Sequence, residues 1–129
     1  MELTLRAALV AWLASDPVLA ARLNAVAEEA PARTSLPWLA VAASASTDWS
    51  CKTAAGREVR IALELHCRGD APDAAADLVA AIEARVEALP RTQGPLRIAA
   101  IQFLRAHAEQ RPANTRAVLL EYRFRALAT

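Results

Sequence analysis

The sequence predicts an α+β fold, with an antiparallel or mixed β-sheet of about four strands and helices packed on one face of it. Two segments, 58–68 and 118–126, alternate between an apolar side and a largely polar side, as strands with one buried face do. A third segment, 73–89, has apolar residues at helical spacing. The expected order of elements is helix, helix, strand, strand, helix, strand, strand.

The N-terminal part predicts one helix, a break and a short second helix. Apolar residues recur at helical spacing until Ser15-Asp16-Pro17 interrupts them, and the pattern then resumes at Val18, Leu19 and Leu23. Trp12 lies on the apolar stripe of the first helix, so we expect it in the core. Residues 24–35 show no clear period and predict a connection over the surface.

Residues 36–68 predict a hairpin. Pro37 opens a first strand that runs to about Ala45, because proline is tolerated at a strand start. A polar loop, 47–53, leads to the second strand, in which apolar residues face one side and polar residues the other. The apolar side carries Val59, Ile61, Leu63, Leu65 and Cys67, and the polar side carries Glu58, Arg60, Glu64, His66 and Arg68.

The next helix is the clearest in the chain. Asp70 can cap its first turn, Pro72 fits that turn, and Asp73 favours the positive end of the helix dipole. Pro90 ends the helix, and residues 93–95 form a turn. The apolar stripe consists of Ala75, Leu78, Val79, Ile82, Val86 and Leu89.

Residues 96–106 can be written as either a helix or a strand. We favour a strand, because the alternating segment after it needs a partner in the sheet. A hairpin turn over 109–114 joins the two. In the last strand Val118, Leu120, Tyr122, Phe124 and Ala126 alternate with Leu119, Glu121, Arg123 and Arg125.

Length, charge and hydropathy argue against several classes of function. A chain of 129 residues is expected to form a single domain, 1–129, and its 15 basic and 14 acidic residues are mixed without runs of like charge. Specific binding to nucleic acid is therefore not expected, since it normally needs clustered Lys and Arg. The absence of a basic n-region and of a span of about 20 apolar residues predicts a soluble, cytoplasmic protein without a membrane partner.

No motif indicates catalysis, a cofactor or a metal. Ser50, His66 and Asp48 are not set in a nucleophile turn, and the three glycines form no phosphate loop. Adjacent strand residues such as His66 and Cys67 point to opposite faces and cannot share a metal without a bulge. Cys51 and Cys67 are expected to be free thiols, although they could approach each other across the hairpin. We expect no catalytic, cofactor-binding or metal-binding residue, and no enzyme.

Two features indicate a binding surface. Trp49 has only polar neighbours, so it is either folded back over its own sheet edge or an anchor for a partner's pocket. Trp38 could lie in the core or at an interface. The polar side of the predicted sheet carries both signs of charge, which suits either solvent or pairing with a neighbouring copy, and it comprises Arg60, Glu64, His66, Glu121, Arg123 and Arg125.

Three stretches carry a resemblance to a known family. They are the opening Met1-Glu2-Leu3-Thr4-Leu5-Arg6-Ala7-Ala8-Leu9, the centre from Thr47-Asp48-Trp49-Ser50 to Gly56-Arg57-Glu58, and the closing Tyr122-Arg123-Phe124-Arg125-Ala126-Leu127. With the order of elements, they make the chain resemble the tail-terminator, or tail-completion, proteins of long-tailed phages. The resemblance is closer still to the counterparts of these proteins in phage-like gene transfer agents.

The resemblance implies a hexameric ring that caps the tail tube, stops its polymerisation and joins the tail to the head. It implies as partners other copies of the chain, the tail tube protein and a head-side connector or stopper, with DNA passing through the pore without specific binding. Such a protein would assemble in the cytoplasm and become part of the particle. Carried onto this chain, the resemblance places partner contacts at Thr47, Asp48, Trp49, Ser50, Lys52 and Arg57, with a second set at Arg60, Glu64, Glu121, Arg123 and Arg125.

Two other functions remain open on the sequence. One is a non-virion α+β module that binds a ligand or partner without catalysis, for which the fold alone would be uninformative. The other is a small enzyme whose site no motif marks. A ligand-sized cavity with convergent polar groups would favour the enzyme, whereas a flat sheet with a protruding hairpin would count against it.

Overall fold

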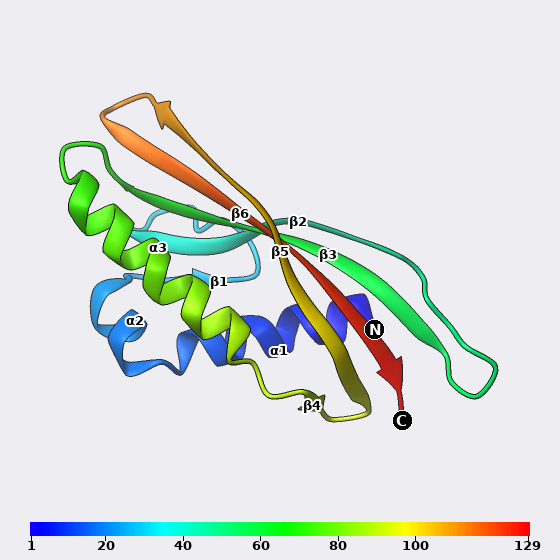
Figure 1. Cartoon of the computed structure of the whole chain (residues 1–129). Helices are drawn as coiled ribbons and strands as arrows, with labels where there is room; N and C mark the ends of the chain where they lie inside the picture. The colour runs from blue at the N-terminus through cyan, green and yellow to red at the C-terminus, as the bar shows by residue number, and fades with distance from the viewer.

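The computed structural model describes residues 1–129. It confirms the α+β class, with three helices and six strands (Figure 1). The helices are α1 (Glu2–Ala14), α2 (Pro17–Arg22) and α3 (Pro72–Glu87), and the strands are β1 (Val26–Ala27), β2 (Trp38–Asp48), β3 (Gly56–Arg68), β4 (Thr92–Gln93), β5 (Leu96–Arg111) and β6 (Thr115–Ala128).

The six strands form one sheet in the order β1-β2-β3-β6-β5-β4. Strand β1 is parallel to β2, and all other neighbours are antiparallel. The predicted count of about four strands is too low, because it contains only the four long strands. The two missed strands have two residues each: β1 lies in the predicted connection 24–35, and β4 overlaps the start of the predicted turn 93–95. Such short runs carry no periodicity.

The helices cover one face of the sheet, and the hydrophobic core lies between the two layers (Figure 1). We call the uncovered side the open face. The alternation predicted for β3 and β6 is confirmed, because the apolar side chains of both strands are buried against the helices. The largest fully buried residues are Tyr122, Phe124, Leu5, Leu9, Leu13, Leu19, Leu39, Ile61, Leu63, Leu65, Ile82 and Leu89.

The long strands extend further than the sequence predicts. Strand β2 continues past Ala45 to Asp48, so two residues of the predicted loop belong to the strand. The choice of a strand for 96–106 is confirmed, and β5 continues to Arg111. The tips of the β2–β3 and β5–β6 hairpins therefore lie at opposite ends of the sheet, and the β2–β3 hairpin runs beyond the helix layer (Figure 1). Between β5 and β6 only residues 112–114 form the turn, with Ala113 and Asn114 at positive φ.

Two details of the helices differ from the prediction. Helix α3 has Pro72 in its first turn as expected, but its N-cap is Ala71 and no side chain caps it, so Asp70 is not the cap. Trp12 is half-buried at the edge of the core, where its indole N–H donates to the carbonyl of Arg85 at 2.7 Å. The Arg85 guanidinium lies 3.2 Å from the centre of the Trp12 ring and joins α1 to α3.

The two cysteines lie at opposite ends of β3. Cys51 is exposed at the hairpin tip and Cys67 is buried, so they do not approach each other, and both are free. No helix has the length and apolar character that crossing a membrane requires.

Candidate partner-contact surface

The tip of the β2–β3 hairpin is internally hydrogen-bonded. The backbone N–H of Trp49 donates to the carbonyl of Gly56 at 2.9 Å, and that of Cys51 donates to Ala54 at 2.9 Å. The Ser50 hydroxyl accepts from the N–H of Gly56 at 3.0 Å and donates to the Asp48 carboxylate at 2.7 Å. The loop predicted as a contact site is therefore held in one conformation by its own residues.

Gly56 allows this close packing. A Cβ at this position would lie 2.5 Å from the Trp49 carbonyl oxygen and 2.7 Å from Leu127 Cδ2. Both distances are far below van der Waals contact. A glycine is therefore required where the tip meets β6.

The side chain of Trp49 is half-buried, and it turns back toward its own sheet. The Arg125 guanidinium of β6 lies 5.5 Å from the centre of its ring, which is a cation–π distance. The sequence left open whether Trp49 folds back over its own sheet or projects as an anchor for a partner. In the structure of the single chain it folds back, and part of the indole remains exposed. An indole held in this way can still meet a partner, because its position is already fixed.

Glu58 links the tip to the charged residues of the open face. Its Oε1 lies 3.3 Å from Nε of Arg125 and 3.4 Å from Nε of Arg123. Glu58 and Arg125 are also directly opposite each other in the β3–β6 register. Trp49 of the tip and the predicted residues Arg123 and Arg125 thus lie on one continuous surface, which runs from the tip along the open face.

Further along the open face, most charges are paired. Glu121 accepts from Nε of Arg105 at 2.7 Å, and Glu64 pairs with His66 and, at 3.8 Å, with Arg111. Trp38 stacks on the ring of His66 with centroids 4.0 Å apart, so this tryptophan also lies on the open face. Arg60 is exposed and has neither an ion pair nor a side-chain hydrogen bond.

Arg57 lies apart from these charges, on the side of the sheet that faces the helices. Its guanidinium donates to the Ser46 hydroxyl at 3.0 Å, and Ser46 donates to Glu2 at 2.7 Å. Ser44 donates to the other oxygen of Glu2 at 2.6 Å. These two hydrogen bonds, more than the nearby arginines, hold the pKa of Glu2 below its usual value. The network fixes the hairpin arm to the start of α1.

The sequence prediction missed several residues of this surface. Glu58 was placed on the polar side but not among the contacts, and the cross-strand register with Arg125 is what identifies it. The whole contribution of β5 was missed, because 96–106 could be written as either a helix or a strand and 109–114 was predicted to be a turn. Two register shifts in β5, after Ile98 and after Phe103, explain why an alternating pattern cannot be seen there. The missed residues of β5 are Gln102, Arg105, His107, Glu109 and Arg111.

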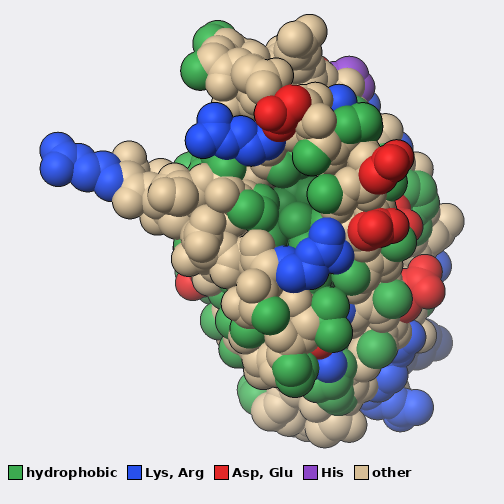
Figure 2. All heavy atoms as spheres, turned by 90° about the vertical axis from the view of Figure 1, so that its left-hand side faces the viewer, with side chains coloured by type: hydrophobic (Ala, Val, Ile, Leu, Met, Phe, Trp, Pro, Cys, Tyr) green, Lys and Arg blue, Asp and Glu red, His purple; other side chains and the backbone are tan.

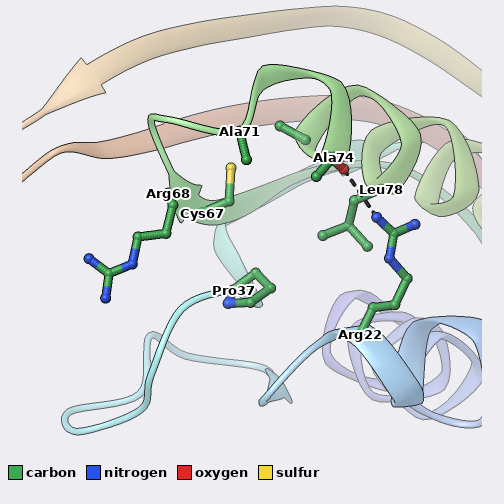
Figure 3. A pocket seen from close by; sticks show the side chains of 8 residues that line it. Arg22, Pro37, Cys67, Arg68, Ala71, Ala74 and Leu78 are labelled. Carbon is green, nitrogen blue, oxygen red and sulfur yellow. Dashed lines mark hydrogen bonds between the residues drawn. The ribbon is translucent and has the colours of Figure 1, made fainter.

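A hollow lies elsewhere, where the N-terminal end of α3 meets α2 and the end of β3. Its floor is apolar and arginines flank it (Figures 2 and 3). Arg22 donates to the carbonyl of Ala74 at 3.2 Å, and burial raises the pKa of the Cys67 thiol. No histidine or carboxylate lines the hollow, and none of the predicted contact residues does. It offers no acid or base pair for catalysis.

Comparison with known proteins supports the resemblance seen in the sequence. The family model of tail completion protein gp17 matches residues 7–127. Among solved structures, a chain from the virion of a native gene transfer agent (GTA) particle superposes with a TM-score of 0.79 at 24% sequence identity. The match covers 96% of this chain and 95% of that chain, and it shows a shared fold. No curated protein matches the sequence.

Proposed function

Because the chain belongs to the tail completion protein gp17 family, we propose that it forms a hexameric ring that caps the tail tube, stops tube polymerisation and joins tail to head. The family assignment makes it a structural protein of a phage-type tail. The observation that carries the finer proposal is the β2–β3 hairpin, which projects beyond the helices and ends in an ordered tip.

The hairpin tip is the proposed contact with the tail tube or with a ring neighbour. Its internal hydrogen bonds mean that little conformational entropy is lost on binding. Trp49 is the proposed anchor, since tryptophan is among the residue types that most often dominate the binding energy of an interface. The contact set is Thr47, Asp48, Trp49, Ser50 and Lys52, with Arg57 holding the arm from below.

The charged open face is the second proposed contact, either between protomers or along the pore. Arg123 and Arg125 share Glu58, and Arg105 and Arg111 have carboxylate partners. Arginines neutralised in this way release few counterions to a phosphate backbone, so DNA can pass without being held. In this proposal Arg60, Glu64, Glu121, Arg123 and Arg125 set the register between neighbours and do not grip DNA.

The proposed role involves no catalysis. Its partners are other copies of the chain, the tail tube protein and a head-side connector or stopper. The protein assembles in the cytoplasm and then remains in the particle. The non-virion module considered above has no observation in its favour once the family match covers residues 7–127.

The proposal is tested by producing particles without this protein and imaging them. We expect tails of uncontrolled length or heads that remain unjoined, and the wild-type chain supplied in trans should restore both features. Particles with tails of normal length, joined to heads, would overturn the proposal.

A further inference from the structure

Two long edges of the sheet lack a backbone partner. Strand β1 covers β2 only at Leu39 and Ala40, and β4 covers β5 only at Leu96 and Arg97. After the register shift at 41–43, β2 pairs with β3 without interruption over residues 43–48. After its last register shift, at 103–105, β5 pairs with β6 without interruption over residues 105–111. These two stretches, here called the β2 edge and the β5 edge, offer unpaired N–H and C=O groups of the kind that template strand addition.

The strand directions of the two edges are complementary. Strands β2, β3, β6 and β5 alternate in direction across the sheet, so β5 runs opposite to β2. If a second copy is placed to continue the sheet, its β2 edge lies antiparallel to the β5 edge of the first. Because the two edges are different surfaces, this contact is heterologous and can be repeated from copy to copy around a ring.

Each edge also presents outward-pointing N–H and C=O groups at every second residue, as antiparallel pairing requires. The backbone N–H of Trp49 donates to Gly56 of β3. Since backbone groups alternate in direction along a strand, the N–H and C=O groups of Ser44, Ser46 and Asp48 point away from β3, toward the free edge. The N–H of Gly69 donates to the carbonyl of Asn114, so in β6 the backbone N–H and C=O groups of even-numbered residues point toward β3. Those of odd-numbered residues point toward β5. By the β5–β6 register, the groups that point outward from the β5 edge are then those of Ala106, Ala108 and Gln110.

On both edges the outward-pointing residues have their side chains on the helix side of the sheet. Ser44 and Ser46 bond to Glu2 of α1, while Ala106 and Ala108 lie opposite the core residues Leu120 and Val118. In an antiparallel pair the two hydrogen-bonded residues point to the same side. The next copy would therefore join with its helices and its open face on the same sides as the first.

We propose that copies of the chain join by antiparallel pairing of the β5 edge of one with the β2 edge of the next. The inference rests on the proposed ring and names its contact. If residues 43–48 of one copy pair with residues 106–111 of the other, Ser46 forms a hydrogen-bonded pair with Ala108, and Ala45 lies opposite Glu109. Ala45 lies beside Arg60, which has no partner within its own chain, and an alanine leaves room for Glu109 of the neighbouring copy to approach that guanidinium.

The first test uses disulfide trapping in purified particles. In a Cys51→Ser/Cys67→Ala background, Ala45→Cys is combined in turn with His107→Cys, Glu109→Cys or Arg111→Cys. Opposed residues of adjacent strands are about 4.5–5.5 Å apart at Cα, within the range for a disulfide. We expect a ladder of linked copies on a non-reducing gel from one of these pairs. The matched control, Ala45→Cys with Arg97→Cys, should give none, because Arg97 lies on β5 outside the proposed edge.

The second test removes an outward-pointing N–H. Ala108→Pro should fold like the wild type, since an edge strand tolerates proline where the N–H faces solvent, but it should no longer be incorporated into particles. Ala108→Ser keeps the N–H and should be incorporated normally.

The outcomes separate the two proposals. If the protein caps the tail but none of the three cysteine pairs links copies and Ala108→Pro is incorporated normally, edge pairing is wrong and the capping function stands. If the protein is absent from particles with normal tails, the proposed function itself is wrong.

Discussion

The Arg125 guanidinium lies 5.5 Å from the centre of the Trp49 ring, although Trp49 belongs to the β2–β3 tip and Arg125 to β6. Glu58 also pairs with Arg125, and its Oε1 lies 3.3 Å from Nε of that arginine. The position of the indole thus depends on a chain of contacts from the tip into the centre of the sheet. This relationship makes the tip an ordered part of the open face.

Replacing Trp49 should impair assembly and leave the fold intact. Trp49 lies outside the core, so Trp49→Ala should cost only about 1 kcal/mol of unfolding free energy, the size of an exposed cation–π contact. Loss of a central anchor should weaken tail binding by about 2 kcal/mol, or roughly thirtyfold. Thermal unfolding and a pull-down with tail tubes measure the two effects.

Trp38→Ala is the matched control, because Trp38 is also half-buried on the open face but lies near the other end of the sheet. It should leave tail binding unchanged. Equal losses of tail binding in the two variants would show that the indole of Trp49 has no special role.

Substitution of Gly56 should destabilise the protein more than its position beside a loop would suggest. In Gly56→Ala the new methyl would overlap the Trp49 carbonyl and Leu127, and relief of this overlap should cost about 1–3 kcal/mol. Urea unfolding measures the loss, with Ala55→Ser in the same loop as the control. A Gly56→Ala protein as stable as the control would contradict the close packing of tip and β6.

Removing the hydroxyl of Tyr122 should stabilise the protein. This oxygen is buried without a hydrogen-bond partner, and burial, with Glu83 and Glu87 nearby, raises the pKa of the phenol. Tyr122→Phe keeps the ring and removes an unsatisfied polar atom, so we expect a gain of about 1 kcal/mol in urea unfolding. Tyr122→Leu, which loses the ring, should destabilise. A clear loss of stability in Tyr122→Phe would mean that the hydroxyl has a partner in solution.

Glu2 should make the attachment of the hairpin arm dependent on pH. Its pKa is lower in the folded chain than in the unfolded chain, because Ser44 and Ser46 donate to the carboxylate. The stability it contributes is therefore present above the ordinary carboxyl pKa of 4.5 and is lost as the pH falls through the lowered value. Glu2→Gln should flatten the acid limb of a plot of unfolding free energy against pH. An unchanged acid limb would remove Glu2 from this role.

The long elements of the fold could be predicted because each has a periodic pattern that burial enforces. The alternation in β3 and β6 and the stripe of α3 correspond directly to the buried faces. The strand at 96–106 was found only by requiring a partner for β6. Its two register shifts break the alternation, and most of its side chains are exposed. The sequence of β5 therefore shows no apolar pattern that would identify which side of the strand is buried.

The contact surface could be predicted only in part. Polar neighbours placed Trp49 outside the core, but its approach to Arg125 depends on how the tip folds over β6. Arg57 seemed to belong with the tip, yet its odd-numbered position in β3 turns it toward the helix side and Ser46. The edge strands could not be identified from the sequence at all, since strand order is a property of the whole sheet.

The most direct test of the central claim is a reconstruction of the tail end of the assembled particle by electron cryomicroscopy. We predict a ring of six copies at the head-proximal end of the tube, with the β2–β3 tips and Trp49 in contact with the tube or with neighbouring copies. A tail end without this chain, or a ring whose β2–β3 tips touch no other protein, would contradict the account.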